Sequence, residues 1–260
     1  PAKDAQQILF FSVVGGLCPL IPVPCLDTIF LKVVRRLMAA AQLRHSGLQA
    51  TMGQVSVLGR EPSMTPQQCA LKVAYFGCCC CTLEFVFKKV CFFLTLKDCV
   101  DNASELLHDG WLLAYAAKAG FITQATLADK AELWRVSEAI VQTCGEADTT
   151  VLKQALKQVL GNNKSDMRES ANTVNGALRL QGIGTGCLSS NVSDNNVQEA
   201  LDSVEQEQRS ELRGITGKLA ELLRSQRPYF SKLEQTFVQK LGNLRQRSAQ
   251  PPSQCPLLPC

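Results

Sequence analysis

Four consecutive cysteines are the residues of this chain with the clearest potential for chemistry. They are Cys78, Cys79, Cys80 and Cys81. The run contains one Cys-x-x-Cys spacing, which serves zinc binding or thiol redox chemistry in the right context. Tetrahedral zinc would need a second ligand pair, and the only two histidines, His45 and His108, stand at no zinc-finger distance from the run. Because four successive side chains on a helix also point around the full circle, we predict neither a metal site nor a bound cofactor.

Burial as small hydrophobic residues is the interpretation that we favour for these cysteines and for most of the thirteen in the chain. Reversible palmitoylation beside an apolar helix is the functional alternative, and it would make residues 78–81 a lipidation site. Neighbouring cysteines do not easily pair with one another, and disulfide-rich domains are short and secreted. We therefore expect the protein to face a reducing compartment, on the cytoplasmic side of a membrane.

Glu105 and His108 have the spacing of a carboxylate-bridged di-iron ligand pair. Such a centre needs a second pair of this kind and two further glutamates on apolar helices, and the sequence has no second Glu-x-x-His. At 100° per residue, Asp98 and Asp101 share one side of a helix with Glu105 and His108. We therefore predict a solvated face, which would become a polar channel or a lipid-headgroup contact if the helix were buried.

Other catalytic motifs are equally weak in this sequence. The glycines of residues 182–186 invite a phosphate-loop interpretation, but no Gly-Lys-Ser/Thr follows them and no strand is expected before them. A serine nucleophile elbow is absent, and two histidines leave little material for a catalytic triad. We therefore predict that the protein is not an enzyme.

The composition favours helices over strands. Of the 260 residues, 46% are hydrophobic and only 6% aromatic, and alanine, leucine, glutamine, lysine and glutamate dominate long stretches. We predict an all-α fold, an apolar helical bundle with a C-terminal helical hairpin. The net charge of +4 is small compared with the basic surface that nucleic-acid binding requires, so we expect no nucleic-acid partner.

Four regions follow from the changes in composition along the chain. Residues 1–181 are predicted to form the apolar bundle, with membrane association as an expectation. Residues 182–196 resemble a linker, residues 197–247 an amphipathic helical hairpin, and residues 248–260 a disordered, proline-containing tail. Within the bundle, Gly15 and Gly16 are expected to end the first helix near Val14, because adjacent glycines break helices.

Two apolar segments approach the length of about 20 residues that a membrane span requires. Ala70–Phe87 carries only Lys72 and Glu84, which lie near its ends and can reach the headgroups. Ile8–Leu26 has no charge but is interrupted by glycines and prolines, as in a re-entrant hairpin or a buried helix with its loop. The sequence leaves insertion, peripheral attachment and a buried core open.

Basic residues flank these two segments. They are Lys32, Arg35, Arg36, Lys88 and Lys89. Flanking positive charge suits anionic lipid headgroups, so we expect membrane-surface contacts there, with ordinary surface charge as the equally supported alternative.

Residues 15–47 read GGLCPLIPVPCLDTIFLKVVRRLMAAAQLRHSG. A break of small residues, a proline-rich turn, an aspartate and an aliphatic helix that ends near glycine follow one another. This order resembles an element of EcsC-like proteins and of the helical domain appended to some membrane-associated bacterial GTPases. The resemblance implies an apolar helical bundle linked to membranes, with Pro22, Pro24 and Asp27 at the structural turn and helix start. The sequence has no GTP-binding motif, so nucleotide chemistry is not implied.

These observations predict a non-enzymatic, membrane-associated helical protein with a partner-binding or scaffolding role. Membrane lipid is one expected partner, and a protein bound through the C-terminal helices is the other. A helical bundle in solution that serves as an oligomerisation scaffold is the first alternative, and a carrier of a lipid or another apolar ligand is the second.

Overall fold

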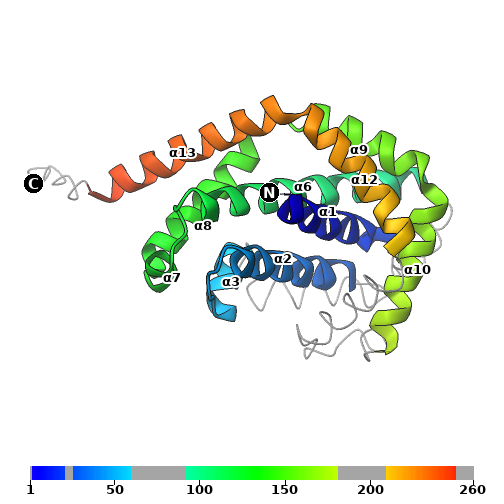
Figure 1. Ribbon diagram of the computed structural model, residues 1–260, viewed down its shortest axis with the longest axis horizontal. Coiled ribbons are helices and arrows are strands. Elements are labelled where there is room, and N and C mark those ends of the chain that lie inside the picture. Colours follow the sequence, from blue (N-terminus) through cyan, green and yellow to red (C-terminus); the bar gives the residue numbers. More distant parts are fainter. Residues whose placement is uncertain (1, 21–25, 60–91, 181–208, 250–260) are drawn as a thin grey trace, which may run out of the picture.

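The computed structural model describes residues 2–20, 26–59, 92–180 and 209–249, and within these residues it contains helices and no strand (Figure 1). The prediction of an all-α bundle is confirmed. The helices are α1 (Ala2–Leu17), the 3-10 helix η1 (Cys18–Leu20), α2 (Leu26–His45), α3 (Met52–Leu58), α6 (Phe92–Lys118), α7 (Gln124–Ala128), α8 (Lys130–Glu146), α9 (Thr150–Asn162), α10 (Lys164–Leu180), α12 (Arg209–Ser225) and α13 (Arg227–Ala249).

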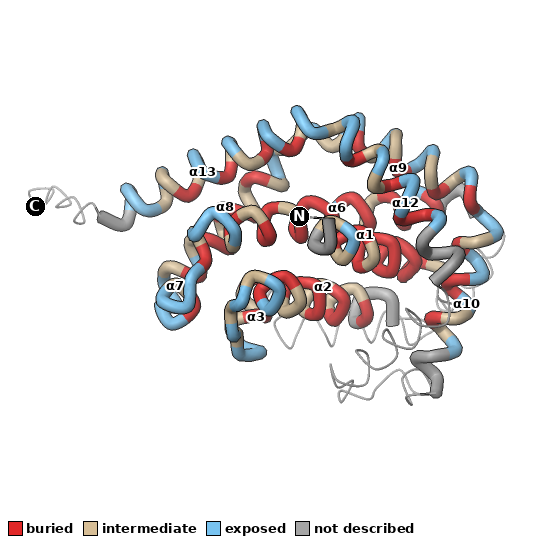
Figure 2. Tube along the Cα trace, viewed as in Figure 1, coloured by how far each residue is buried: buried red, intermediate tan, exposed pale blue. Residues whose placement is uncertain are grey.

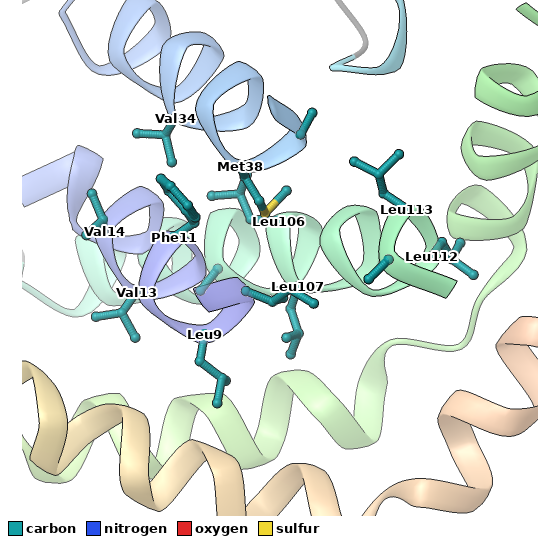
Figure 3. Close-up of a cluster of buried hydrophobic side chains, with 14 of the residues drawn as sticks. Leu9, Phe11, Val13, Val14, Val34, Met38, Leu106, Leu107, Leu112 and Leu113 are labelled. Carbon is teal, nitrogen blue, oxygen red and sulfur yellow. The ribbon is translucent and has the colours of Figure 1, made fainter. Parts of the chain in front are cut away.

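Helix α1 is the centre of the bundle. It lies along α6 and also contacts α2, α10 and α12, so neighbours surround most of its length (Figure 1). Figure 3 shows Phe11 and Val14 of this helix on the side that faces α2, and Leu9 and Val13 on the opposite side. Ile8 is 2% exposed and Leu17 is fully buried. The part of the apolar segment Ile8–Leu26 that the structure describes, up to Leu20, is therefore core.

The expected break at Gly15 and Gly16 is wrong, because α1 continues through both residues to Leu17. The reason is a close approach to α6. A Cβ atom on Gly16 would lie 3.0 Å from the Cβ of Ala103 and 3.1 Å from the carbonyl oxygen of Cys99. Glycine is used here because it leaves space for a neighbouring backbone, and its weak helix propensity is offset by packing.

Helix α6 extends over 27 residues and contacts α1, α2, α8, α9 and α13. Gly110 leaves space for side chains of α2 and α1, since a Cβ there would lie 2.8 Å from the sulfur of Met38 and 3.0 Å from a methyl carbon of Ile8. The helix ends before Gly120, whose φ of 79° is the left-handed conformation typical of a glycine C-cap. Helix α8 begins after its N-cap Asp129, whose Oδ1 accepts hydrogen bonds from two backbone N–H groups.

The C-terminal helices α12 and α13 bury the apolar faces that the sequence predicts. Phe230, Leu233, Phe237 and Leu241 are each at most 4% exposed. Among the described residues, α12 packs mainly on α1 and α9, whereas α13 packs mainly on α8, so the two helices diverge from Gln226 over the bundle (Figure 1). Their inner faces belong to the same core as α1, and their outer faces are exposed (Figure 2).

Several expectations fall on parts of the chain outside the described residues. These are the candidate span Ala70–Phe87, the linker 182–196 and residues 250–260 of the predicted tail. The first two residues of that tail, 248 and 249, were predicted to be disordered but belong to α13. Among the helices that are described, none combines the length and the apolar character that crossing a bilayer requires.

Replacing Gly16 with alanine tests the close approach of α1 to α6. The added methyl group would crowd the backbone of α6, so we expect Gly16→Ala to lower the free energy of unfolding by about 1–2 kcal/mol, despite the better helix propensity of alanine. Gly217 lies in α12, and a Cβ there would meet no atom within 4 Å. We expect Gly217→Ala to raise the free energy by about 0.4–1 kcal/mol. Urea unfolding of both variants measures these changes in the free energy of unfolding. Changes of the same sign in the two variants would contradict the close packing of α1 on α6.

Candidate functional site: a polar seam along α6

A connected set of polar side chains lies between α6 and three of its neighbours, and we call it the polar seam. It consists of Arg35 from α2, Glu105, His108 and Asp109 from α6, Cys144 from α8 and Tyr229 from α13. The members from α6 are one residue or one turn apart, which lets one helix present polar groups to neighbours on adjacent sides. The arrangement joins segments that are far apart in the sequence.

His108 lies at the centre of the seam, and its predicted exposure to solvent is wrong. The side chain is 2% exposed, because α13 covers this side of α6. Nδ1 lies 2.6 Å from the carbonyl oxygen of Ser104, and Nε2 lies 2.5 Å from the hydroxyl of Tyr229. A carbonyl oxygen can only accept, so the tautomer with hydrogen on Nδ1 satisfies both contacts: Nδ1 donates to Ser104, and Tyr229 donates to Nε2.

Tyr229 is held in its protonated form by its surroundings. Burial, followed by smaller electrostatic contributions from the nearby Cys144 and Asp148, raises the pKa of Tyr229 to about 12. A protonated phenol is the form that donates to His108. The phenol of Tyr229 therefore stays protonated at physiological pH and remains able to donate its hydrogen bond from α13 to α6.

Aromatic contacts strengthen the same junction. The indole N–H of Trp111 donates to Oε1 of Glu234 at 2.8 Å. Its ring lies 4.3 Å from the ring of Phe230, centroid to centroid, and Phe230 also contacts His108 and Tyr229. Stacked and edge-on aromatic pairs add to the energy of burial. Helix α13 is therefore fixed to α6 by both hydrogen bonds and ring contacts.

The second half of the seam is ionic and joins α2 and α8 to α6. Nη2 of Arg35 lies 2.6 Å from Oε1 of Glu105, and its Nε lies 3.9 Å from Oδ2 of Asp109. The other oxygen of Asp109 accepts from the thiol of Cys144 at 3.6 Å. Asp109 is 9% exposed, so the guanidinium beside it compensates a largely buried carboxylate.

The rest of the predicted acidic face agrees with the expectation. Asp98 is exposed, and Asp101 forms an ion pair with Lys153 of α9, 2.7 Å away. Glu105 is exposed on one side while it contacts Arg35 on the other. Only the C-terminal end of this face, at His108, turns into the bundle.

The geometry of the seam suits a joint between helices. The thiol of Cys144 donates to Asp109 and the phenol of Tyr229 donates to His108, so each contact joins α6 to a different neighbouring helix. Among the residues that the structure describes, no three metal-binding side chains come together. Cys99, beneath the seam in α6, has a pKa raised to about 12 by burial and then by Asp98, which keeps its thiol protonated.

Most of the predicted site residues lie outside the described part of the chain. They are Cys78, Cys79, Cys80, Cys81, Lys88, Lys89, Pro22 and Pro24. Asp27 lies in the first turn of α2, at the helix start that was expected, and Lys32 and Arg36 are half-buried along that helix.

Arg35 was predicted to contact lipid headgroups, but its side chain lies inside the bundle. Its side chain is only 13% exposed, and its guanidinium faces Glu105 and Asp109. Contact with a lipid phosphate would require it to give up this pairing. Arg35 therefore acts within the bundle.

The cysteines in the described residues partly match their predicted role. Cys18 and Cys99 are buried among aliphatic side chains, as expected of small hydrophobic residues, and Cys144 is half-buried in the seam. Cys144, Tyr229 and Glu234 were not predicted from the sequence as site residues. The one available signal was Glu105-x-x-His108 beside Trp111, a polar group on an otherwise apolar helix that required partners from elsewhere.

Comparison of the chain with protein-family models, with curated proteins and with solved structures finds no match. The polar seam and the surface of the bundle are therefore the basis for any functional proposal.

Replacing Tyr229 with phenylalanine tests the central hydrogen bond of the seam. The change keeps the ring but leaves Nε2 of the buried His108 without its donor, so we expect the free energy of unfolding to fall by about 1–2 kcal/mol. Tyr115 of α6 is a matched control, because it is half-buried and makes no hydrogen bond through its hydroxyl to the described part of the chain. Tyr115→Phe should change stability by less than about 0.5 kcal/mol. Equal losses in urea unfolding would contradict the role of Tyr229.

Alkaline pH tests the burial of the same phenol. Its pKa is about 12 in the fold, against 10.0 for an ordinary tyrosine. The unfolded chain therefore loses this proton first, so the contribution of Tyr229 to stability is complete below pH 10 and is lost as the pH rises towards 12. We expect the free energy of unfolding to fall more steeply over this range in the unmodified protein than in Tyr229→Phe. Parallel pH profiles for the two proteins would contradict the raised pKa.

Proposed function

We propose that the protein is a non-enzymatic, membrane-associated helical scaffold. In this proposal the bundle is held at a bilayer through the apolar stretch Ala70–Phe87 and presents its C-terminal helices to a protein partner. The main observation behind the proposal is that the other long apolar segment, Ile8–Leu26, lies inside the bundle as far as the structure describes it, up to Leu20. Residues 8–20 are enclosed by α2, α6, α10 and α12, so their hydrophobicity is used by the core. This leaves Ala70–Phe87 as the apolar stretch that is available for lipid.

The positions of its flanking residues support such an attachment. Gly59 follows α3 and is buried against α2, where a Cβ would lie 3.4 Å from the side chain of Arg36. Phe92 begins α6, the helix that contacts most of the bundle. A segment fixed to the core at both ends would transmit its attachment to the whole bundle. Lys88 and Lys89 stand shortly before Phe92 in the sequence and suit anionic headgroups.

The surface of α13 supports the scaffolding part of the proposal. Its outer side carries four exposed amide side chains at helical spacing, which are Gln235, Gln239, Asn243 and Gln246. Amide groups both donate and accept hydrogen bonds, so a stripe of them offers a partner directional contacts without a strong charge requirement. The polar seam holds α13 in place and thereby fixes the direction in which this stripe faces.

Membrane fractionation tests the attachment. We expect the protein to stay in the membrane pellet through a carbonate wash at high pH and to be released by detergent, because apolar insertion is insensitive to salt and pH. Phe85→Glu combined with Phe87→Glu should move it to the carbonate-soluble fraction, since charges inside the hydrocarbon layer are costly. Val151→Glu, at an apolar side chain of α9 that is 50% exposed, is the matched control and should change nothing. Recovery of the unmodified protein without detergent would contradict the proposal.

A further inference from the structure

One end of the bundle combines exposed apolar side chains with an excess of positive charge, and we call it the basic end. It is formed by the C-terminus of α2, by α3, by the C-terminus of α6, by α7, by the first turns of α8 and by the last turns of α13 (Figure 1). The loop after α2 is tied to α7 by two hydrogen bonds between Gln49 and Gln124. Gln54 of α3 donates to the carbonyl of Leu127, and Ser137 of α8 donates to that of Val57.

The last turns of α13 reach the same end. The guanidinium of Arg245 lies 6.0 Å from the ring centroid of Phe121, in the loop between α6 and α7, and its Nε lies 2.7 Å from Oε1 of Glu132 in α8. These contacts make the basic end a connected surface built by six helices.

Two large apolar side chains are exposed on this surface. Trp134 is 57% exposed and Met52 is 49% exposed, although both belong to helices whose other faces are well packed. A tryptophan ring with its polar N–H is the side chain most suited to the boundary between headgroups and hydrocarbon. Methionine adapts its shape to irregular, mobile surroundings.

Basic residues lie on the same helices as these two side chains or on neighbouring ones. Arg44, Lys118, Lys130 and Arg247 are exposed, and the exposed Arg245 pairs with Glu132. The acidic groups nearby are Asp129, Glu132 and Glu138, and each is engaged within the fold. Asp129 caps α8, and Glu138 accepts from Gln142 at 2.9 Å.

Glu132 forms ion pairs with two arginines, Arg135 and Arg245. Partial burial by itself would raise the pKa of Glu132, but the hydrogen bonds and charges of these arginines hold it below the ordinary value. The basic end therefore keeps a positive excess at neutral pH, which attracts an anionic surface.

We propose that the basic end docks on the surface of an anionic lipid bilayer, with Trp134 and Met52 among the headgroups and the surrounding lysines and arginines against lipid phosphates. The inference rests on the proposed membrane association and names the surface that faces the bilayer. Two features favour lipid over an acidic protein as the occupant. The apolar side chains are few and come from separate helices, which suits a fluid headgroup layer. Gly59, beyond which the chain leads to Ala70–Phe87, follows α3 of this same end.

Tryptophan fluorescence reports directly on this docking, because the chain has only two tryptophans. Trp111→Phe leaves Trp134 as the sole emitter, and Trp134→Phe leaves Trp111, which is bonded to Glu234 inside the bundle. On vesicles of phosphatidylcholine and phosphatidylserine, we expect the emission of Trp134 to shift to shorter wavelength and to be quenched by brominated acyl chains. The emission of Trp111 should stay unchanged. An unchanged Trp134 emission while the protein floats with the vesicles would overturn the proposal, as would equal responses from both tryptophans.

Charge reversal supplies a second measurement. We expect Lys118→Glu with Lys130→Glu to weaken flotation with the anionic vesicles by about tenfold or more, because each basic residue at such a surface contributes to the attraction. Lys157→Glu with Lys164→Glu reverses two exposed charges on α9 and α10, away from the basic end, and should weaken it by less than about twofold (Figure 1). Circular dichroism is the control that both double variants are folded. An equal loss of vesicle binding in the two double variants would overturn the proposal.

The outcomes also separate this inference from the proposed function. If the protein needs detergent for release but Trp134 shows no shift, only the docking surface is wrong. If Trp134 shifts on anionic vesicles but carbonate releases the protein from membranes, only insertion of Ala70–Phe87 is wrong, and attachment is peripheral.

Discussion

The close contact of α1 with α6 sets the positions of the other helices in the described bundle. Gly16 of α1 leaves room for the backbone of α6, and Gly110 of α6 leaves room for the side chains of Met38 and Ile8. The approach buries the apolar residues of α1 against α2, α6 and α12, and burial of this kind is the main favourable contribution to folding. An apolar segment that approaches the length of a membrane span thus becomes the inner helix of the bundle.

The polar seam complements this apolar contact on the other sides of α6. Hydrogen bonds and ion pairs from Arg35, Cys144 and Tyr229 reach three residues of α6 that lie close together in sequence. Because buried polar groups are costly without partners, each of these contacts requires one particular placement of the neighbouring helix. The seam therefore adds specificity to a core that aliphatic packing alone would hold less uniquely.

Much of the fold could be predicted from local patterns, whereas the site could not. The composition predicted the all-α class, and the amphipathic pattern of the C-terminal region predicted that α12 and α13 bury one face. Gly15 and Gly16 were misjudged because their role depends on α6, which lies far along the chain. His108 was placed in solvent because its partner, Tyr229, is 121 residues away. Periodicity on one helix cannot show which of its polar residues a distant helix will cover.

A single division of roles connects the fold with the proposed function. In this proposal, the apolar residues of α1 form the interior, the basic end and Ala70–Phe87 contact the membrane, and the seam fixes α13 so that its outer face is available to a partner. The proposal depends on α1 being a stable interior helix before any lipid is present.

Hydrogen exchange followed by mass spectrometry is the most direct test of that central claim. Amide exchange in α1 and α6 would be measured in detergent-free buffer and again with anionic vesicles. The account predicts that both helices exchange slowest of the described chain without lipid and that vesicles leave them unchanged, because their protection comes from the core. Rapid exchange of α1 in buffer that becomes slow only with vesicles would contradict it, since α1 would then be a membrane segment rather than the centre of the bundle.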